Sequence, residues 1–318
     1  MKLPFAPNII EHAAFTIGET PSKIAQCKHL LAKAHIQAFR QYNHPIVTVA
    51  ADIYNIEVEA HGAIVRFYDD HSIPGICMRP SNPQFFGFSP RAGRISMILD
   101  AATLVKEEIG NETRVGVGIC GPFSIMTELI GYESMIDIAY NSNGNTLTSY
   151  LEKLLEHQKG YCNEIAARGL GVTVYESWAS PPLVSPDMYR QFAFPYEKAL
   201  FAHLDSLGIT SHALIIGGDT RAIARDMLAA GSTMLLSDYS TPLPLYVEMA
   251  KEAGVTLRAN IDPKQVQRGD WPQIQARISE IAAQAKIYPN MVIGTGVVPY
   301  DTPPEHIFKI IDMIGDCK

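Results

Sequence analysis

The sequence predicts an α/β fold of the (β/α)8 TIM-type barrel class, with one of the eight strands irregular or missing. Short apolar runs rich in β-branched residues alternate with longer amphipathic segments along most of the chain. Most of the apolar runs end on a polar residue or a glycine, as expected where parallel strands present side chains to a pocket. No glycine-rich dinucleotide fingerprint follows the first long apolar run, which argues against a Rossmann sheet.

Composition limits the classes of protein to which the chain can belong. Its 318 residues are 47% hydrophobic and 19% charged, as expected for a globular protein with strands buried on both faces. The net charge of −7 argues against a surface for nucleic acid or anionic membranes. The five cysteines form no CxxC pair, the first residues do not have the composition of a signal peptide, and no apolar run is long enough to cross a bilayer. We therefore expect a reduced, cytoplasmic protein.

The alternation gives seven strand-then-helix units within a single domain, residues 1–318. The first long helix is predicted over residues 20–43, because Thr20 suits an N-cap and Pro21 suits the first helical position. Strands are predicted at residues 46–51, 115–119, 172–175, 213–216, 233–236, 256–259 and 291–294. Further helices are predicted at residues 91–109, 124–130, 146–168, 186–207, 220–230, 242–253, 271–286 and 303–314.

Two regions lie outside this alternation. Residues 1–45 form a helical N-terminal segment, and residues 61–90 form an excursion rich in proline and glycine that still contains aromatic residues. Because long structured loops on a barrel often cover the pocket, we expect the excursion to act as a lid. The eighth strand is expected near the N-terminus or inside this excursion.

The strand ends supply the candidate site residues. Asp52 follows the first predicted strand, where it either faces the pocket or caps the next helix. Comparable positions after later strands are held by Cys120, Glu176, Ser177, Asp219, Asp238, Asn260 and Thr295. Asp219 also suits a helix cap, Asn260 suits a bracing role in the turn before Pro263, and Cys120 is either a reactive thiol or a buried inert one. The chain has no Gly-x-Ser-x-Gly elbow, so Ser177 is not interpreted as an acyl nucleophile.

Several motifs, in this order and spacing, resemble the uroporphyrinogen decarboxylase superfamily, which includes corrinoid-linked methyltransferases. The matching pieces are Asp52 with residues 57–62, Gly121-Pro122-Phe123 with Gly131, Glu176-Ser177-Trp178-Ala179, Ser185-Pro186, Phe194-Pro195-Tyr196, Ala259-Asn260-Ile261-Asp262-Pro263, Gly294-Thr295-Gly296, and Thr302-Pro303. The resemblance implies a (β/α)8 barrel with its pocket at the carboxyl ends of the strands. It also implies pocket roles for Asp52 and Ser177, the two family positions that this chain keeps.

The departures from the family pattern concern the decarboxylase chemistry. The arginine-containing segment Arg-Gln-Ala-Gly-Arg of true decarboxylases is absent before Asp52, and Arg40 is the only arginine in the first 50 residues. The family's pocket tyrosine falls at Glu128, and its late histidine falls at Thr295. A multiply anionic porphyrinogen requires cationic partners, so the resemblance is nearer to the methyltransferase branch, with residues 54–59 and Gly294-Thr295-Gly296 as its support.

Metal ligation is a further implication of this branch. Zinc-dependent members use a histidine and two cysteines at positions that are Ile215, Gly217 and Val297 here, so a His/Cys zinc site is excluded. Other members hold zinc or another divalent metal through carboxylate and imidazole ligands. The corresponding candidates are Glu57, Glu59, His61 and His212, with Glu176 and Asp219 in reserve. As a helix, residues 57 and 61 share one face; as a strand, residues 57, 59 and 61 do. A solvated helix face with ordinary pairing is the alternative.

The expected function is methyl transfer between a small methylated substrate and a corrinoid carried by a partner protein. Asp52 and Glu57 would orient or protonate the leaving heteroatom, and any metal would act on it as a Lewis acid. The substrate pocket is expected to contain Tyr54, Phe123, Met126, Glu128, Glu176, Trp178, Asp219, Asp238, Tyr239, Asn260 and Thr295. The resemblance also implies a homodimer. Two alternatives stay open: a decarboxylase or lyase that acts on a tetrapyrrole or a smaller acid through Asp52, and a binding protein without catalysis.

Overall fold

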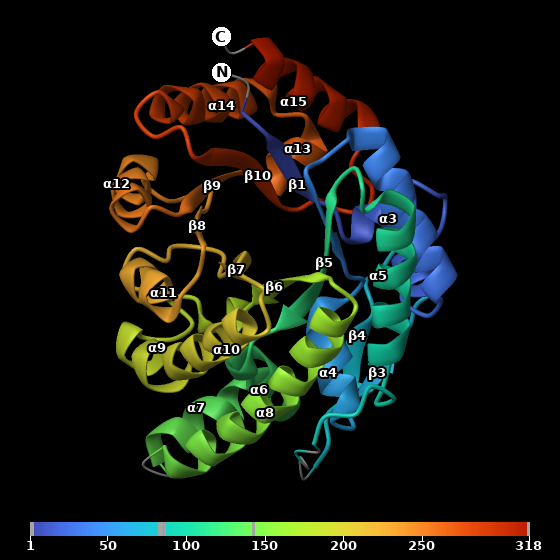
Figure 1. The fold of residues 1–318 in the computed structure, drawn as a ribbon, viewed down its shortest axis with the longest axis vertical. Helices are drawn as coiled ribbons and strands as arrows, with labels where there is room; N and C mark the ends of the chain where they lie inside the picture. Colours follow the sequence, from blue (N-terminus) through green and yellow to red (C-terminus); the bar gives the residue numbers. More distant parts are fainter. Residues whose placement is uncertain (1–2, 82–84, 86, 142–143, 317–318) are drawn as a thin grey trace.

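The structure, a computed structural model, describes residues 3–81, 85, 87–141 and 144–316. Its strands and helices alternate around a ring, with the helices outside (Figure 1). Parallel pairing joins eight strands into two four-stranded sheets, in the orders β1-β10-β9-β8 and β2-β5-β6-β7. The strands are β1 (Phe5–Asn8), β2 (Ile46–Val49), β5 (Arg114–Cys120), β6 (Gly171–Tyr175), β7 (His212–Ile215), β8 (Met234–Ser237), β9 (Thr256–Ile261) and β10 (Met291–Val297). The predicted fold class is confirmed.

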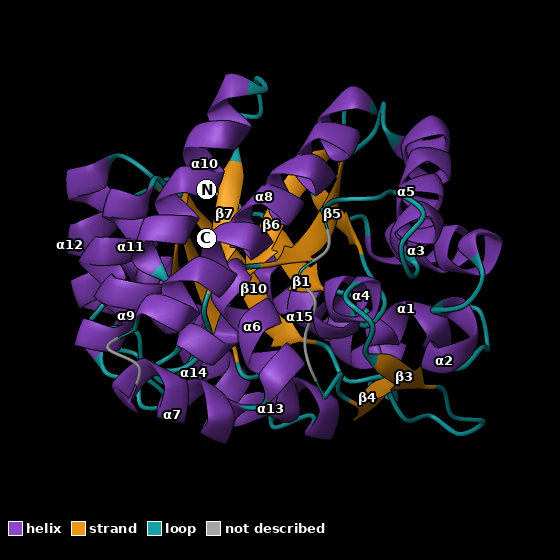
Figure 2. Ribbon diagram, turned by 90° about the horizontal axis from the view of Figure 1, so that it is seen from below, coloured by secondary structure: helices purple, strands orange, loops and turns teal. Residues whose placement is uncertain are grey.

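Helices cover the outside of both sheets (Figure 2). Those of the first half are α1 (Glu11–Phe15), α2 (Pro21–Ile24), α3 (Lys28–Tyr42), α4 (Ile53–Ala60), α5 (Ile95–Ile109), α6 (Pro122–Ile130), α7 (Tyr132–Asn141) and α8 (Asn145–Ala167). Those of the second half are α9 (Pro186–Phe192), α10 (Phe194–Ser206), α11 (Ala224–Ala230), α12 (Leu243–Ala253), α13 (Pro263–Arg268), α14 (Trp271–Ala285) and α15 (Pro304–Asp316), together with a single 3₁₀ turn, η1 (Ser177–Ala179). The longer helices bury an apolar stripe: α15, for example, buries Ile307, Ile310 and Ile314. Each such side chain contributes about 1.5–3 kcal/mol when fully buried.

The irregular eighth strand is β1, near the N-terminus, one of the two places where it was expected. It pairs with β10, and its register shifts between Ala6 and Asn8. Pro7 lies at the shift, and a proline nitrogen cannot donate to a ladder. The strand has only four residues, FAPN. These are too few and too mixed to form an alternating apolar pattern from which a strand could be predicted.

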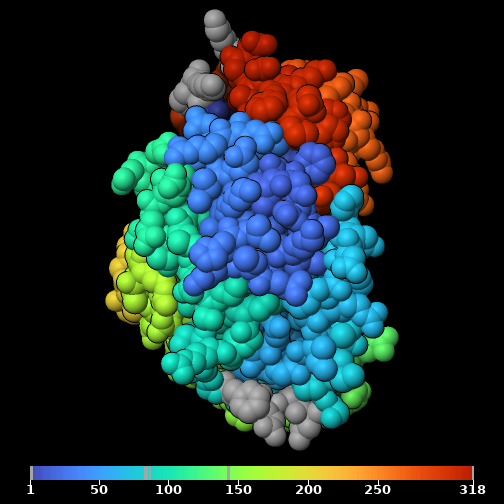
Figure 3. All heavy atoms as spheres, turned by 90° about the vertical axis from the view of Figure 1, so that its right-hand side faces the viewer, coloured from blue at the N-terminus to red at the C-terminus, as the bar shows by residue number. Residues whose placement is uncertain are grey.

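Two seams separate the hydrogen-bonded sheets, and side chains bridge both. Between β7 and β8, the backbone N–H of Leu214 donates to Ser232 Oγ (3.1 Å) and that of His212 donates to Thr233 Oγ1 (3.1 Å). The seam between β1 and β2 is covered by the N-terminal helices, which lie against the C-terminal residues in Figure 3. There the ring of buried His12 bonds the carbonyl of Tyr300 (3.0 Å) and the hydroxyl of Tyr42 (2.8 Å). The N-terminal segment therefore connects the two halves.

Two predicted helices are interrupted. The N-cap at Thr20 is confirmed, since its hydroxyl accepts from the backbone N–H of Lys23 (3.3 Å), but the helix breaks between α2 and α3. The helix predicted over residues 186–207 is divided at Ala193, because Pro195 cannot donate the bond that a continuous helix requires there. Helices α7 and α13 were not predicted. Residues 53–60, for which helix and strand were both open, form α4.

The excursion at residues 61–90 contains a short antiparallel pair, β3 (Ile64–Arg66) and β4 (Gly75–Met78), which lies apart from the barrel strands (Figure 2). Part of it, residues 82–84 and 86, lies outside the described residues. Its role as a lid and the single-domain organisation stay predictions. In the described part of the chain, no helix combines the length and the apolar composition needed to cross a membrane.

Candidate active site

The inward-facing side chains of the barrel enclose a cavity of about 500 Å³ that opens at the carboxyl ends of the strands. Alternate residues of the strands line it, as the two-residue period requires. These are Ala6 and Asn8 (β1), Ile46 and Thr48 (β2), Thr173 and Tyr175 (β6), Ala213 and Ile215 (β7), Met234 and Leu236 (β8), Arg258 and Asn260 (β9), and Thr295 and Val297 (β10). Small side chains at several inward positions leave the middle of the barrel open. A cavity of this volume suits a small organic molecule.

The predicted pocket residues divide into two groups. Those that line the cavity are Asp52, Tyr54, Ser177, Asp238, Tyr239, Asn260 and Thr295. Those that lie outside its lining are Glu57, Phe123, Met126, Glu128, Glu176, Trp178 and Asp219. The first group consists mostly of residues directly at strand ends, for which the barrel topology alone predicts the location.

Asp52 is buried in an ion pair. Arg94 donates from Nη1 to Oδ1 and from Nη2 to Oδ2 of Asp52, both at 2.7 Å, and Asn55 donates to Oδ2 at 2.8 Å. Burial raises the pKa of Asp52, and the hydrogen bonds from Arg94 oppose that rise. The Asp52 side chain does not cap α4. It presents a fixed, hydrogen-bonded carboxylate to the cavity wall.

Tyr54 and Ser177 meet at the cavity, beyond the ends of β2 and β6 of the same sheet. The backbone N–H of Ser177 donates to the Tyr54 hydroxyl at 3.3 Å. Burial raises the pKa of Tyr54, so its phenol stays protonated at neutral pH. The pair offers the cavity two neutral hydroxyl groups, which are suited to orienting a ligand.

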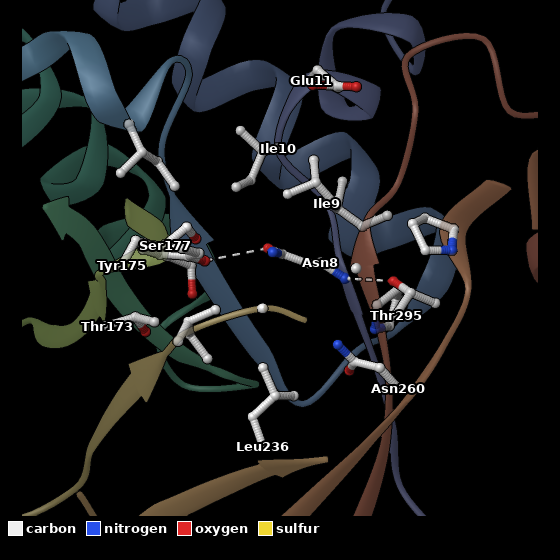
Figure 4. Close-up of a pocket in the computed structure, with 18 of the residues that line it drawn as sticks. Asn8, Ile9, Ile10, Glu11, Thr173, Tyr175, Ser177, Leu236, Asn260 and Thr295 are labelled. Atoms are coloured by element: carbon white, nitrogen blue, oxygen red, sulfur yellow. Dashed lines mark hydrogen bonds between the residues drawn. The ribbon is translucent and has the colours of Figure 1, made fainter. Parts of the chain in front are cut away.

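On the opposite wall, amides and hydroxyls converge around β1, β9 and β10. Asn8 lies between Tyr175 and Thr295 (Figure 4). Its backbone N–H donates to Thr295 Oγ1 (3.1 Å), and its side-chain oxygen accepts from the Tyr175 hydroxyl (3.4 Å). Asp238 uses its carboxylate to accept from two backbone groups, Gly218 N (2.7 Å) and Tyr239 N (2.9 Å). This wall of the cavity is polar, and these hydrogen bonds fix the positions of its side chains.

The sequence analysis missed Arg258 and Glu11 among the ionisable residues of the cavity. Arg258 points into the barrel from β9, and Glu11 lines the cavity from the start of α1. Burial raises the pKa of Glu11 to about 7. An arginine between Leu257 and Ala259 in a predicted buried strand was a usable signal, because buried charges are rare without a purpose. Glu11 carried no such signal.

Two further carboxylates are buried beside the turn that follows β5. Glu57 accepts from the backbone N–H of Cys120 (2.8 Å), and Glu176 accepts from that of Ser124 (2.5 Å). Desolvation raises the pKa of each to about 7. The same burial raises the pKa of the Cys120 thiol, which favours the inert alternative for this cysteine.

The other predicted residues outside the lining have identifiable partners. Trp178 donates from Nε1 to Glu128 (2.8 Å), while Phe123 and Met126 are fully buried in the core. Asp219 forms an exposed ion pair with Arg221. These contacts anchor the loops that surround the cavity.

The structure separates the four predicted metal ligands. Glu59 accepts from Arg94 Nε (2.7 Å), and Glu57 is bonded to the backbone at Cys120. The ring of His61 lies against that of His157, with centroids 4.5 Å apart and planes tilted by 52°. His212 lies at the start of β7, at the end of the barrel opposite the strand-end residues. Among the described residues, no three His, Cys, Asp or Glu side chains are grouped so that they could hold a metal. The grouping of these four as one site is not found, and no step is derived through a metal.

Apolar side chains surround the mouth of the cavity. Ile73, Tyr239 and Val297 line it and are also 44%, 43% and 37% exposed. We call these three residues the apolar rim. Such exposure of large apolar groups around a cavity is typical of a binding surface.

Comparisons with known proteins agree with this architecture. The family profile described as "Uroporphyrinogen decarboxylase (URO-D)" matches residues 2–316. A uroporphyrinogen decarboxylase of Thermus thermophilus is 29% identical over 173 residues, which cover 52% of this chain and 47% of the relative. A methylcobamide:CoM methyltransferase, MtaA, of Methanosarcina barkeri is 28% identical over 179 residues, covering 54% of this chain and 51% of the relative. The chain thus spans about half the length of these curated relatives.

A solved structure described as a methyltransferase from Methanosarcina mazei superposes with a TM-score of 0.85 at 19% sequence identity. The match covers 99% of this chain and 94% of that one. At this identity the match shows a shared fold. With the profile match over nearly all of its length, the chain belongs to the uroporphyrinogen decarboxylase family.

Proposed function

We propose that the protein transfers a methyl group between a small methylated substrate and a corrinoid carried by a partner protein. The observation that carries this proposal is the cavity, which is of small-molecule size and opens through an apolar rim. The rim suits the face of a large macrocycle presented by another protein. The names of relatives such as the methylcobamide:CoM methyltransferases support the same reaction class.

The corrinoid would supply the methyl acceptor, or the methyl donor in the reverse direction. In the forward direction the carbon–heteroatom bond breaks, its electron pair stays on the heteroatom, and the heteroatom takes a proton. Asp52, fixed by Arg94, and the hydroxyls of Tyr54 and Ser177 orient the substrate. Glu11 supplies the proton, because it lines the cavity and its pKa of about 7 leaves a proton available near neutrality.

This assignment replaces Glu57 by Glu11 as the proton donor. Glu57 has a similarly raised pKa, but it lies outside the cavity lining and is bonded to the backbone at Cys120. A general acid must reach the atom that it protonates, and the location of Glu11 allows this. The homodimer stays a prediction.

The charge of the cavity supports methyl transfer over uroporphyrinogen decarboxylation. Of the lysines and arginines among the described residues, only Arg258 lines the cavity, together with three acidic residues, Glu11, Asp52 and Asp238. A multiply anionic porphyrinogen would meet one cation and three carboxyl groups there. Such a cavity disfavours that substrate electrostatically.

The test uses the full chain with methylcobalamin and a panel of small thiols, alcohols and phenols. Loss of methylcobalamin absorbance and formation of the methylated acceptor, identified by mass spectrometry, are expected. Glu11→Gln should lower the rate by roughly 10²–10⁴-fold. Arg225→Gln is the matched control, since Arg225 pairs with Glu252 on the exposed surface and does not line the cavity.

Two results would count against the proposal. Turnover of uroporphyrinogen by the same preparation would assign the decarboxylase reaction instead. Saturable binding of panel members with no product in any combination would favour the binding protein without catalysis. An unchanged rate in Glu11→Gln would remove Glu11 from the scheme while leaving methyl transfer in place.

A further inference from the structure

The guanidinium of Arg258 lies inside the barrel and is held there by uncharged groups. Its Nε donates to Asn260 Oδ1 at 3.0 Å. Its Nη2 donates to the backbone carbonyls of Ala6 (2.8 Å) and Thr295 (3.1 Å). Three strands, β1, β9 and β10, therefore fix its position.

No described acidic side chain forms an ion pair with Arg258, and its Nη1 has no hydrogen-bond partner among the described residues. Asp238, also in the cavity wall, is an acidic group whose charge acts on Arg258 without contact: its carboxylate accepts from the backbone of Gly218 and Tyr239 and, at 3.5 Å, from Asn260 Nδ2. Burial lowers the pKa of Arg258, yet a guanidinium remains protonated at neutral pH. This half-buried guanidinium has no carboxylate in contact with it, so its unbonded Nη1 can form a charge-assisted hydrogen bond to an oxyanion of a ligand.

The space for this guanidinium is built into β10. A Cβ on Gly294 would lie 2.4 Å from Arg258 Cζ and 2.5 Å from Asn260 Oδ1. Any larger residue would therefore displace the guanidinium. Gly294 pairs directly with Asn260 in the ladder between β10 and β9, so the group is pre-organised by the sheet.

We propose that Arg258 binds the anionic group of the cavity's ligand, and that this ligand carries a single oxyanion: a carboxylate, sulfonate or phosphonate. The inference rests on the proposed function, in which this cavity holds the small substrate, and it adds the chemical class. The oxyanion accepts from Nη1 inside the barrel, in the cavity that Asn8 and Tyr175 also line. The rest of the ligand extends toward Ser177 and the apolar rim.

The test compares small anions with uncharged molecules of the same shape. Butanoate, propanesulfonate and ethylphosphonate are titrated into the full chain at constant ionic strength, beside butanamide and propanesulfonamide, with binding followed by calorimetry and by thermal stability. Wild type is expected to bind at least one anion saturably and the amides about 10- to 100-fold more weakly, the range expected for one charge-assisted hydrogen bond. The three acids distinguish the type of oxyanion. Equal binding of acids and amides by wild type would overturn the proposal.

Variants separate a binding role from a structural one. Arg258→Gln should remove the preference for anions while keeping the affinity for the amides. A purely structural role would weaken both equally, and that result would overturn the proposal. Arg258→Lys keeps the charge, so the preference should persist; its loss in a folded Lys variant would also overturn the proposal. Arg225→Gln is the control and should bind as wild type does.

The outcome is independent of the methyl-transfer assay. Anion binding by Arg258 without turnover would refute the proposed reaction and keep the anion site. Turnover of a neutral substrate without any preference for anions would refute the anion site and keep the proposed reaction.

Discussion

Arg94 places both of its terminal nitrogens 2.7 Å from the two carboxylate oxygens of Asp52. The same guanidinium donates from Nε to Glu59 at 2.7 Å and lies over the ring of Phe67, 5.0 Å from its centroid. One cation thus compensates two carboxylates at the start and end of α4. Asp52, which follows the first long predicted strand, is therefore a hydrogen-bond acceptor held in a fixed position in the cavity wall.

Replacement of Arg94 should be strongly destabilising. Arg94→Gln leaves the buried Asp52 carboxylate without its cation, and breaking a buried pair in this way costs about 3–5 kcal/mol. Urea unfolding at neutral pH measures the change in the free energy of unfolding. Arg40→Gln is the control, because Arg40 donates from Nη1 to both carboxylate oxygens of Glu112 on the exposed surface, and its replacement should change the free energy of unfolding far less. Equal losses in the two variants would contradict the buried pairing.

The contribution of Glu57 to stability should fall as pH rises from about 4.5 to 7. Burial raises the pKa of Glu57 from 4.5 to about 7, so this group binds more protons in the folded chain than in the unfolded chain in this window. Its contribution to the free energy of unfolding therefore decreases with pH there and levels off above about 7, whereas buried His35 and His44, whose pKa values burial lowers to about 4, contribute in the opposite direction. Glu57→Gln, which resembles the protonated form, should remove about 3 kcal/mol of this decrease.

Glu176 tests the same relation independently, because its pKa is also raised to about 7 by burial. Denaturant unfolding at several pH values gives the slopes for wild type, Glu57→Gln, Glu176→Gln and the double variant. Each single variant should lose part of the downward contribution to the pH dependence, and the double variant should lose the most. Variants whose pH dependence equals that of wild type would show that these carboxyls are not held protonated.

The sequence was sufficient for the parts of the site that depend on topology alone. Asp52, Ser177, Asn260 and Thr295 follow strands whose apolar runs are plain, and all four line the cavity. Glu176, which also ends a strand, does not line the cavity. It points under the turn at Gly121, and the direction of a side chain at a strand end depends on local backbone geometry.

The sequence could not predict which side chains from distant segments would contact the site residues. Arg94 lies 42 residues after Asp52, at the N-cap of α5, and nothing in the spacing connects the two. Arg258 was visible as a charge in an apolar strand, but its free Nη1 depends on where β1 and β10 place their carbonyls. The sequence could not show, for a related reason, that the four predicted metal ligands lie apart: Glu59 and His212 each have a partner elsewhere in the fold.

Gly121 should tolerate no side chain. A Cβ there would lie 1.6 Å from Glu176 Oε2, and Gly121 has an ordinary negative φ of −74°, so the constraint is steric. Gly121→Ala should cost about 1–3 kcal/mol of unfolding free energy, as overpacking does. In a Glu176→Ala background the same change should cost much less, which a double-mutant cycle measures. Gly315→Ala is the control: its Cβ would meet nothing within 4 Å and lies in α15, so a gain of about 0.5–1 kcal/mol is expected.

The cysteines should differ sharply in reactivity. Cys77 is exposed on β4, whereas Cys120 and Cys162 are buried in the core. Burial raises the pKa of Cys162 to about 12 and that of Cys120 well above its ordinary value, so neither provides thiolate at neutral pH. Since the thiolate is the reacting species, iodoacetamide should label Cys77 in the native protein and reach the two buried thiols only after unfolding. Peptide mass spectrometry follows each site separately, with labelling in 8 M urea as the reference for full reactivity. Native labelling of Cys120 at a rate near that of Cys77 would mean that the turn after β5 opens to solvent, and Cys120 would then return as a candidate for the chemistry of the site.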